Sequence, residues 1–182
     1  FCVDASGSIG ANGRMEVVKG TIFSILQSNY VFRDKVSLIV FRKDKAELIL
    51  PPTRSTDLAH KLLKEIPTGG TTPLVAGLLK AMDVALEENQ KQTGYLPLII
   101  LLTDARGNVY YKDAIDDVLK TGEQISKNNI STIIIDVEDS NVKLEICKKL
   151  AKSANAAYYH IDNLSNKNIN EILTNEGVLE KN

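Results

Sequence analysis

Three short loops of the sequence carry oxygen-bearing side chains beside hydrophobic segments. The first is Asp4-Ala5-Ser6-Gly7-Ser8, directly after the apolar N-terminal residues. The second is Thr68-Gly69-Gly70-Thr71-Thr72-Pro73, and the third is Thr103-Asp104, at the end of an apolar segment. Carboxylate and hydroxyl oxygens suit Mg²⁺, which prefers a near-octahedral oxygen shell and tends to keep several waters. We therefore expect a metal site if the fold brings the loops together.

The candidate ligands are two carboxylates and three hydroxyls. The Asp-x-Ser-x-Ser spacing lets alternate side chains of one loop turn toward the same point. Two negative charges roughly balance a divalent ion and hydroxyls add none, so the ion would stay electrophilic and could accept a carboxylate from outside. The ligand set is Asp4, Ser6, Ser8, Thr72 and Asp104. Mg²⁺ is the expected ion, with Mn²⁺ or Ca²⁺ as alternatives.

Short apolar runs alternate with segments of helical period, a pattern typical of a doubly wound, Rossmann-like α/β fold with a mostly parallel six-stranded sheet and helices on both faces. Ligands of such sheets bind beyond the carboxyl ends of the strands, where the strand order reverses. If the first and fourth strands are neighbours, the three loops converge there. The expected strands are Phe1–Asp4, Lys35–Phe41, Ala46–Leu50, Leu96–Thr103, Ile130–Asp136 and Ala156–Ile161.

Helices are expected between these strands. Each shows an apolar stripe at helical spacing, and a further helix is expected between Ser55 and Glu65. The stripes consist of Met15, Val18, Ile22, Ile25 and Leu26; Leu74, Leu78, Ala81 and Ala85; Ile115, Val118, Gly122 and Ile125; and Cys147, Leu150, Ala151 and Ala154.

One connection is too short for a parallel crossover. The four residues Arg42 to Lys45 separate the second and third strands, so these strands should form an antiparallel hairpin. We interpret the charges of this turn as solvated rather than as a binding patch. The third strand should be an edge strand that ends at Pro51-Pro52, because proline cannot donate to a further neighbour.

Composition favours one domain over residues 1–182, with a core over 1–174 and a polar tail over 175–182. The net charge of -1 gives no general attraction to nucleic acid or membrane, and we expect a monomer. Cys2 and Cys147 fall on apolar segments and should be reduced core residues, which favours a cytoplasmic location. Because the chain begins at the end of a strand, we expect it to be a domain cut from a longer protein.

These motifs resemble a known family. Asp-x-Ser-x-Ser, a later Gly-Gly-Thr-Thr and a later Thr-Asp are similar to the metal-ion-dependent adhesion site of von Willebrand factor A domains. The resemblance implies the same five ligands, with Thr72 preferred over Thr71. It also implies capture of a partner protein's acidic side chain.

A narrower resemblance is to the carboxyl-terminal domain of magnesium chelatase D subunits. It is carried by Phe1–Ser8, Arg14-Met15-Glu16, Val36–Phe41 followed by Arg42, Leu50–Ser55, Pro67–Leu74 and Leu101–Asp104, and it covers about the first 110 residues. It implies an upstream AAA+-like region, an AAA+ or large chelatase subunit as partner, and a role in assembly within a complex that inserts metal into a tetrapyrrole. One departure is Ala105, where the family has glycine after Thr-Asp; Gly107 follows two residues later. A positive φ there would strain alanine.

Other chemistries lack residues that they need. No GxxxxGK[ST] motif exists, and Gly7, Gly10 and Gly13 do not have dinucleotide spacing. Asp4 could be the nucleophile of a Mg²⁺-dependent phosphatase, but Ser6 stands where the general acid is expected. The histidines, His60 and His160, are interpreted as structural or exposed. A structural domain with a vestigial metal site remains a further alternative.

Overall fold

A computed structural model describes residues 1–29, 34–91, 96–106, 112–138 and 145–164. Six strands form one mixed sheet in the order β3-β2-β1-β4-β5-β6, with all neighbours parallel except β2 and β3. This confirms the expected fold class. The strands are β1 Cys2–Asp4, β2 Val36–Arg42, β3 Lys45–Thr53, β4 Leu98–Thr103, β5 Ser131–Asp136 and β6 Ala157–His160.

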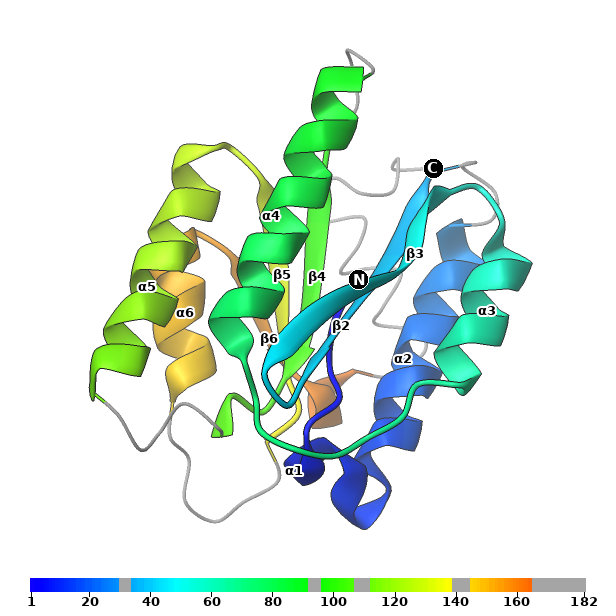
Figure 1. Cartoon of the computed structure of the whole chain (residues 1–182), viewed down its shortest axis with the longest axis horizontal. Helices are drawn as coiled ribbons and strands as arrows, with labels where there is room; N and C mark the ends of the chain where they lie inside the picture. The colour runs from blue at the N-terminus through cyan, green and yellow to red at the C-terminus, as the bar shows by residue number, and fades with distance from the viewer. Residues whose placement is uncertain (30–33, 92–95, 107–111, 139–144, 165–182) are drawn as a thin grey trace.

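Helices cover both faces of the sheet (Figure 1). Helices α2 and α3 pack on one face, and α4, α5 and α6 pack on the other. The longer helices are α2 Arg14–Asn29, α3 Thr56–Lys64, α4 Leu74–Lys91, α5 Lys112–Lys127 and α6 Ile146–Ala154; the short ones are α1 Gly7–Gly10, η1 Ala11–Gly13 and η4 Ile161–Asn163.

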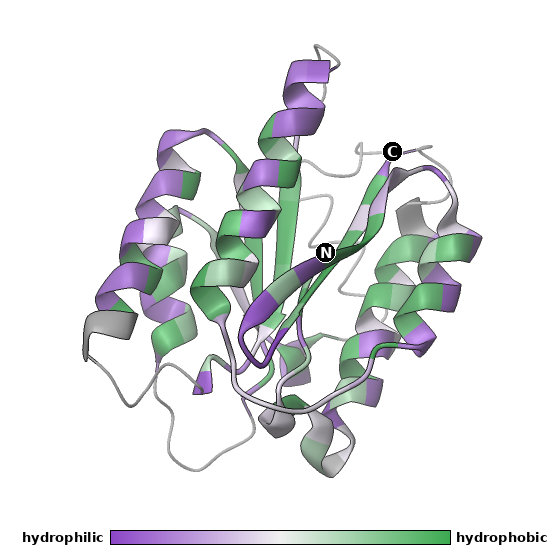
Figure 2. Cartoon of the chain, viewed as in Figure 1, coloured by the Kyte–Doolittle hydropathy of each residue, from purple (hydrophilic) through white to green (hydrophobic). Residues whose placement is uncertain are grey.

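The alternation of side chains along β4 divides the core into two layers. Ile100 and Leu102 pack with α2 and α3, whereas Ile99 and Leu101 pack with α4, α5 and α6. Because β4 is a central strand covered on both faces, its residues 98–102 are apolar at every position, and the first polar residue is Thr103 at its end. Figure 2 shows this pattern, with hydrophobic strands inside and hydrophilic residues on the outer faces of the helices.

The third strand is an antiparallel edge strand, as expected, but it does not end at the prolines. It continues through Pro51 and Pro52 to Thr53, which pairs with Val36. Irregular register between Val36 and Ile39 interrupts the regular ladder here, so the missing N–H groups of the prolines are tolerated.

Cys2 and Cys147 are free and buried, as the sequence predicts. Burial raises the pKa of the Cys2 thiol to about 12 and that of Cys147 well above its ordinary value. Within the described ranges, no helix has the length and apolar character needed to cross a membrane. The expected tail over 175–182 lies outside the described residues.

Candidate metal centre

The first and fourth strands are neighbours in the sheet. Strand β1 lies between β2 and β4 and runs parallel to both. Asp4, the last residue of β1, and Asp104, the first residue after β4, therefore lie at adjacent strand ends. The strand order reverses at this point, because the chain proceeds outward from β1 in one direction and from β4 in the other. Because β1 and β4 are neighbours at the reversal of strand order, the three loops can converge at this end of the sheet.

The first loop is folded around the Asp4 carboxylate. The backbone N–H of Ser6 donates to Asp4 Oδ1 over 2.9 Å, and the hydroxyl oxygens of Ser6 and Ser8 lie 3.1 Å apart. Ser6 precedes the one-turn helix α1, which contains Ser8. The sequence suggested a loop through Ser8; the turn forms because the N–H of Gly10 donates to the carbonyl of Ser6.

The second loop is bonded to the first through backbone groups. The N–H of Gly7 donates to the carbonyl of Gly70, and the N–H of Gly69 donates to the carbonyl of Ala5, both over 2.8 Å. Thr72 is buried, whereas Thr71 is exposed and its hydroxyl donates to the carbonyl of Lys43. Because the Thr71 hydroxyl is already bonded to Lys43, Thr72 is the better candidate ligand of the two.

Thr103 connects the third loop to the first. Its hydroxyl donates to Asp4 Oδ2 over 2.6 Å and accepts from the N–H of Ala105 over 2.9 Å. Ala105 has φ 51, so alanine occupies the left-handed conformation at the position where the resembled family has glycine. Asp104 remains buried and accepts from the N–H of Arg106. Gly107 lies outside the described residues.

Burial makes the ionised form of Asp4 costly. The pKa of the Asp4 carboxyl is raised to about 6, because burial and, to a smaller extent, the nearby charge of Asp104 outweigh the hydrogen bonds from Ser6 and Thr103, which lower it. Asp4 and Asp104 are thus two buried carboxyl groups that lie close enough to influence each other. A cation bound beside Asp4 would favour the ionised form of its carboxyl.

Two arginines beside Asp104 were not among the expected site residues. Arg14 Nη1 lies 3.5 Å from Asp104 Oδ2 and 3.4 Å from the carbonyl oxygen of Ser8. Arg106 Nε lies 4.0 Å from Asp104 Oδ2 and 3.8 Å from a carboxylate oxygen of Glu138. Arg14 belongs to the Arg14-Met15-Glu16 block noted above, but nothing in its spacing indicates that the guanidinium reaches the carboxyl end of β4.

The histidines are elsewhere. The ring of His60 stacks on Phe23 with the centroids 4.2 Å apart. His160 Nε2 lies 2.8 Å from the carbonyl oxygen of Glu138, and Nδ1 lies 3.4 Å from Asp162. Among the described residues neither histidine contacts a serine of the first loop, so no serine–histidine pair is formed there.

The donor set fits a hard divalent cation. Buried carboxylates from two strand ends, with serine and threonine hydroxyls beside them, match the oxygen ligands that Mg²⁺ prefers. Within the described part of the chain, no group of three or more His, Cys, Asp or Glu side chains is placed to hold a metal ion. A metal held by Asp4 and Asp104 would take the rest of its shell from hydroxyls and water.

The family model of the von Willebrand factor type A domain matches residues 1–108. The chain belongs to this family. The sequence is 42% identical over 166 residues to the uncharacterized protein MJ0910 of Methanocaldococcus jannaschii, an alignment that covers 90% of this chain and 95% of the relative. It is also 35% identical over 174 residues to the magnesium-chelatase 67 kDa subunit of Heliobacterium mobile.

The alignment with the chelatase subunit covers 91% of this chain but 26% of the subunit. The similarity thus extends well beyond the first 110 residues, to which the motifs alone had limited it. Among solved structures, BatB from Bacteroides thetaiotaomicron matches with a TM-score of 0.75 at 20% identity, covering 96% of this chain and 93% of BatB. This likeness shows a shared fold.

Proposed function

We propose that this domain binds a divalent cation, Mg²⁺ first among them, and uses it to capture an acidic side chain of a partner protein. The carrying observation is the hydrogen-bonded cluster that joins all three loops around two buried carboxylates, Asp4 and Asp104. When bound, the cation supplies a Lewis-acidic centre that accepts a further carboxylate oxygen.

Hydrogen bonds within the chain hold the oxygen atoms proposed to bind the cation in place before the cation arrives. Ser6 and Thr103 donate to the two oxygens of Asp4, which fixes the plane of its carboxylate. Ser6 and Ser8 are within hydrogen-bond distance of each other, so their hydroxyls face a common region. The proposed ligand set is Asp4, Ser6, Ser8, Thr72 and Asp104. Such preorganisation reduces the entropy lost on binding.

The relatives suggest where such a module acts. Because a magnesium-chelatase subunit shares this domain over about a quarter of its length, we propose that the parent protein belongs to a chelatase-like complex. An AAA+-like region would precede this domain, and an AAA+ or large subunit would supply the acidic side chain. The domain would then serve assembly, while other parts of the complex consume ATP and insert the metal ion.

Surface plasmon resonance tests this proposal. The chain is immobilised and titrated with the purified AAA+ and large chelatase-type subunits of the same organism, in Mg²⁺ and then in EDTA. We expect binding that EDTA abolishes and that Asp4→Asn abolishes in Mg²⁺. Asp83→Asn, at an exposed position on α4, is the matched control and should bind as the wild type does. Affinity that is the same in EDTA would refute the proposal.

A further inference from the structure

The β2–β3 turn is hydrogen-bonded to the second loop of the candidate site. The N–H of Lys43 donates to the carbonyl of Thr71 over 2.9 Å, and the Thr71 hydroxyl donates back to the carbonyl of Lys43. The sequence alone indicated a solvated turn. The charged side chains at positions 43 to 45 are indeed exposed, and the backbone of the turn is in addition hydrogen-bonded to the loop that contains Thr72.

Lys43 is held there in an unusual conformation. It has φ 57 at the first central position of a two-residue turn, where glycine is preferred, and the left-handed conformation costs an ordinary residue about 1–2 kcal/mol. Its stem lies across Gly70, where an added Cβ would come within 2.5 Å of Lys43 Cγ and 3.1 Å of Lys43 Cα. Gly70, at φ 90, is therefore required for this close approach.

Lys43 also differs from the other lysine of the hairpin in its charge environment. Lys45 pairs with Glu47 over 2.7 Å. Lys43 is exposed, and in the described ranges no carboxylate lies within ion-pair distance of its ammonium group. A strained, exposed cation beside a site for carboxylates is suited to a second carboxylate of the same partner.

We infer that Lys43 is a second contact for the partner, and that the partner segment carries two acidic residues close together in sequence. This inference rests on the proposed function. One carboxylate occupies the metal, and its neighbour pairs with Lys43. Lys43 thereby selects a doubly acidic segment over one with a single acidic residue. Because the turn is already bonded to the site loop, the pairing requires little rearrangement of the chain.

The test is an NMR titration of the ¹⁵N-labelled chain in Mg²⁺ with short synthetic peptides. One peptide has a single aspartate among glycines and asparagines, and the others have a second aspartate one, two or three positions later. We expect at least one doubly acidic peptide to bind about threefold more tightly, the scale of an exposed ion pair. Lys43→Gln should abolish this gain and leave the affinity for the singly acidic peptide unchanged.

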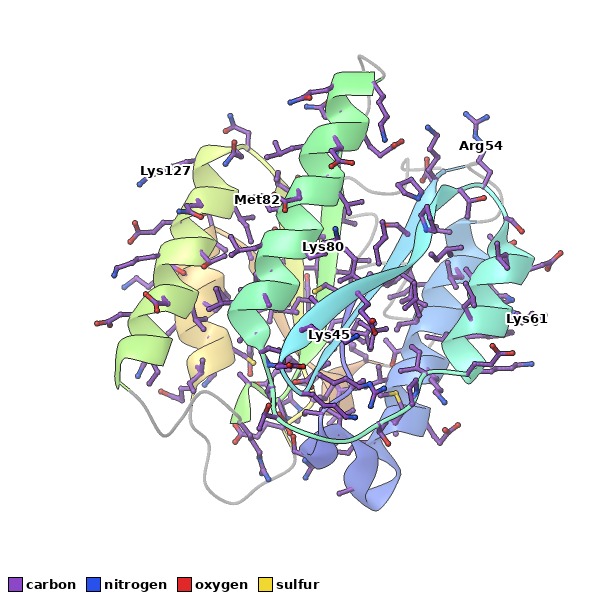
Figure 3. The ribbon with its side chains drawn as sticks, viewed as in Figure 1. Lys45, Arg54, Lys61, Lys80, Met82 and Lys127 are labelled. Carbon is purple, nitrogen blue, oxygen red and sulfur yellow. The ribbon has the colours of Figure 1, made fainter. Side chains whose placement is uncertain are left out.

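Two further variants make the result specific. Lys61 projects outward from α3 (Figure 3), so Lys61→Gln removes one positive charge elsewhere and should keep the gain. Lys43→Gly removes the charge while relieving the backbone strain, so it tests the charge in a chain that remains folded. A gain that persists in both Lys43 variants would overturn the inference and leave the proposed function intact. Absence of Mg²⁺-dependent binding by every peptide would contradict both.

Discussion

The hydroxyl of Thr103 donates a 2.6 Å hydrogen bond to Asp4 Oδ2, joining residues 99 positions apart in the sequence. The bond crosses from the end of β4 to the end of β1 at the reversal of strand order. The same hydroxyl accepts from the N–H of Ala105. Thr103 therefore fixes both the Asp4 carboxylate and the backbone that carries Asp104.

Thr103→Val should destabilise the fold and weaken metal binding. Valine has nearly the same shape but removes the donor to Asp4 and the acceptor for Ala105, and leaving buried polar groups unsatisfied costs about 1–3 kcal/mol. Urea unfolding measures the free energy, and Mn²⁺ titration by electron paramagnetic resonance measures the affinity. Thr132→Val is the control: it is also buried, but its hydroxyl donates to the carbonyl of Ile130, away from the loops. Equal loss of Mn²⁺ affinity in both variants would contradict this role of Thr103.

Asp4→Asn should separate metal binding from folding. In the metal-free protein, burial penalises the Asp4 carboxylate, so neutral asparagine should not lower stability at pH 7. The wild type should gain about 2.7 kcal/mol when Mg²⁺ is present at a hundred times its dissociation constant, and the variant should gain nothing. Thermal unfolding with and without Mg²⁺ tests this. Equal stabilisation of the variant by Mg²⁺ would remove Asp4 from the ligand set.

Bound Mg²⁺ should reverse the direction in which the free energy of unfolding changes with pH. The pKa of Asp4 is raised from 3.8 to about 6 in the folded chain, so the folded state holds this proton more tightly than the unfolded state does. Without metal, the contribution of Asp4 to stability is full below pH 3.8 and is lost as the pH rises through 6, a change of roughly 3 kcal/mol.

Bound Mg²⁺ requires the ionised carboxylate, so its affinity should rise over the same interval. Urea unfolding from pH 4 to pH 7, with and without saturating Mg²⁺, resolves the two effects. Asp4→Asn should remove this part of the profile in both conditions. A wild-type profile that is unchanged by the substitution would show that another group titrates.

Ala105→Gly should alter the free energy of unfolding by less than about 1 kcal/mol. Glycine relieves about 1–2 kcal/mol of left-handed strain but loses backbone entropy worth about 0.5–1 kcal/mol and a buried methyl group worth about 0.8 kcal/mol. Ala105 is fully buried, which explains why alanine is tolerated at φ 51. Ala105→Val, with a branched side chain at the same φ, should cost more than about 2 kcal/mol. Comparable unfolding energies for these two variants would contradict this balance.

Much of the fold could be predicted because its signals are local. The all-apolar run of β4 required two covered faces, and the four-residue connection required a hairpin. The meeting of Asp4 and Asp104 then followed from a general property of parallel sheets. The ion that binds there, and the roles of the five candidate ligands, stay predictions.

The remainder depends on tertiary contacts that leave no local pattern. Arg14 reaches Asp104 from the start of α2 across 90 positions, and Lys43 is fixed by Thr71 across 28 positions. The continuation of β3 through its prolines depends on the irregular register of its pairing with β2. The periodicity of a sequence does not indicate which distant residue a side chain will contact, or where the pairing of two strands will be irregular.

A crystal structure of the chain grown with Mg²⁺ and an aspartate-containing peptide would show whether the three loops hold a cation that binds an outside carboxylate. We expect an octahedral ion bonded to oxygens of the proposed ligands at about 2.1 Å. These ligands are Asp4, Ser6, Ser8, Thr72 and Asp104. A peptide carboxylate should complete the shell of the ion. A crevice without an ion at high Mg²⁺, or an ion bound at another place while the peptide still binds, would show that these residues do not form a metal-dependent binding site.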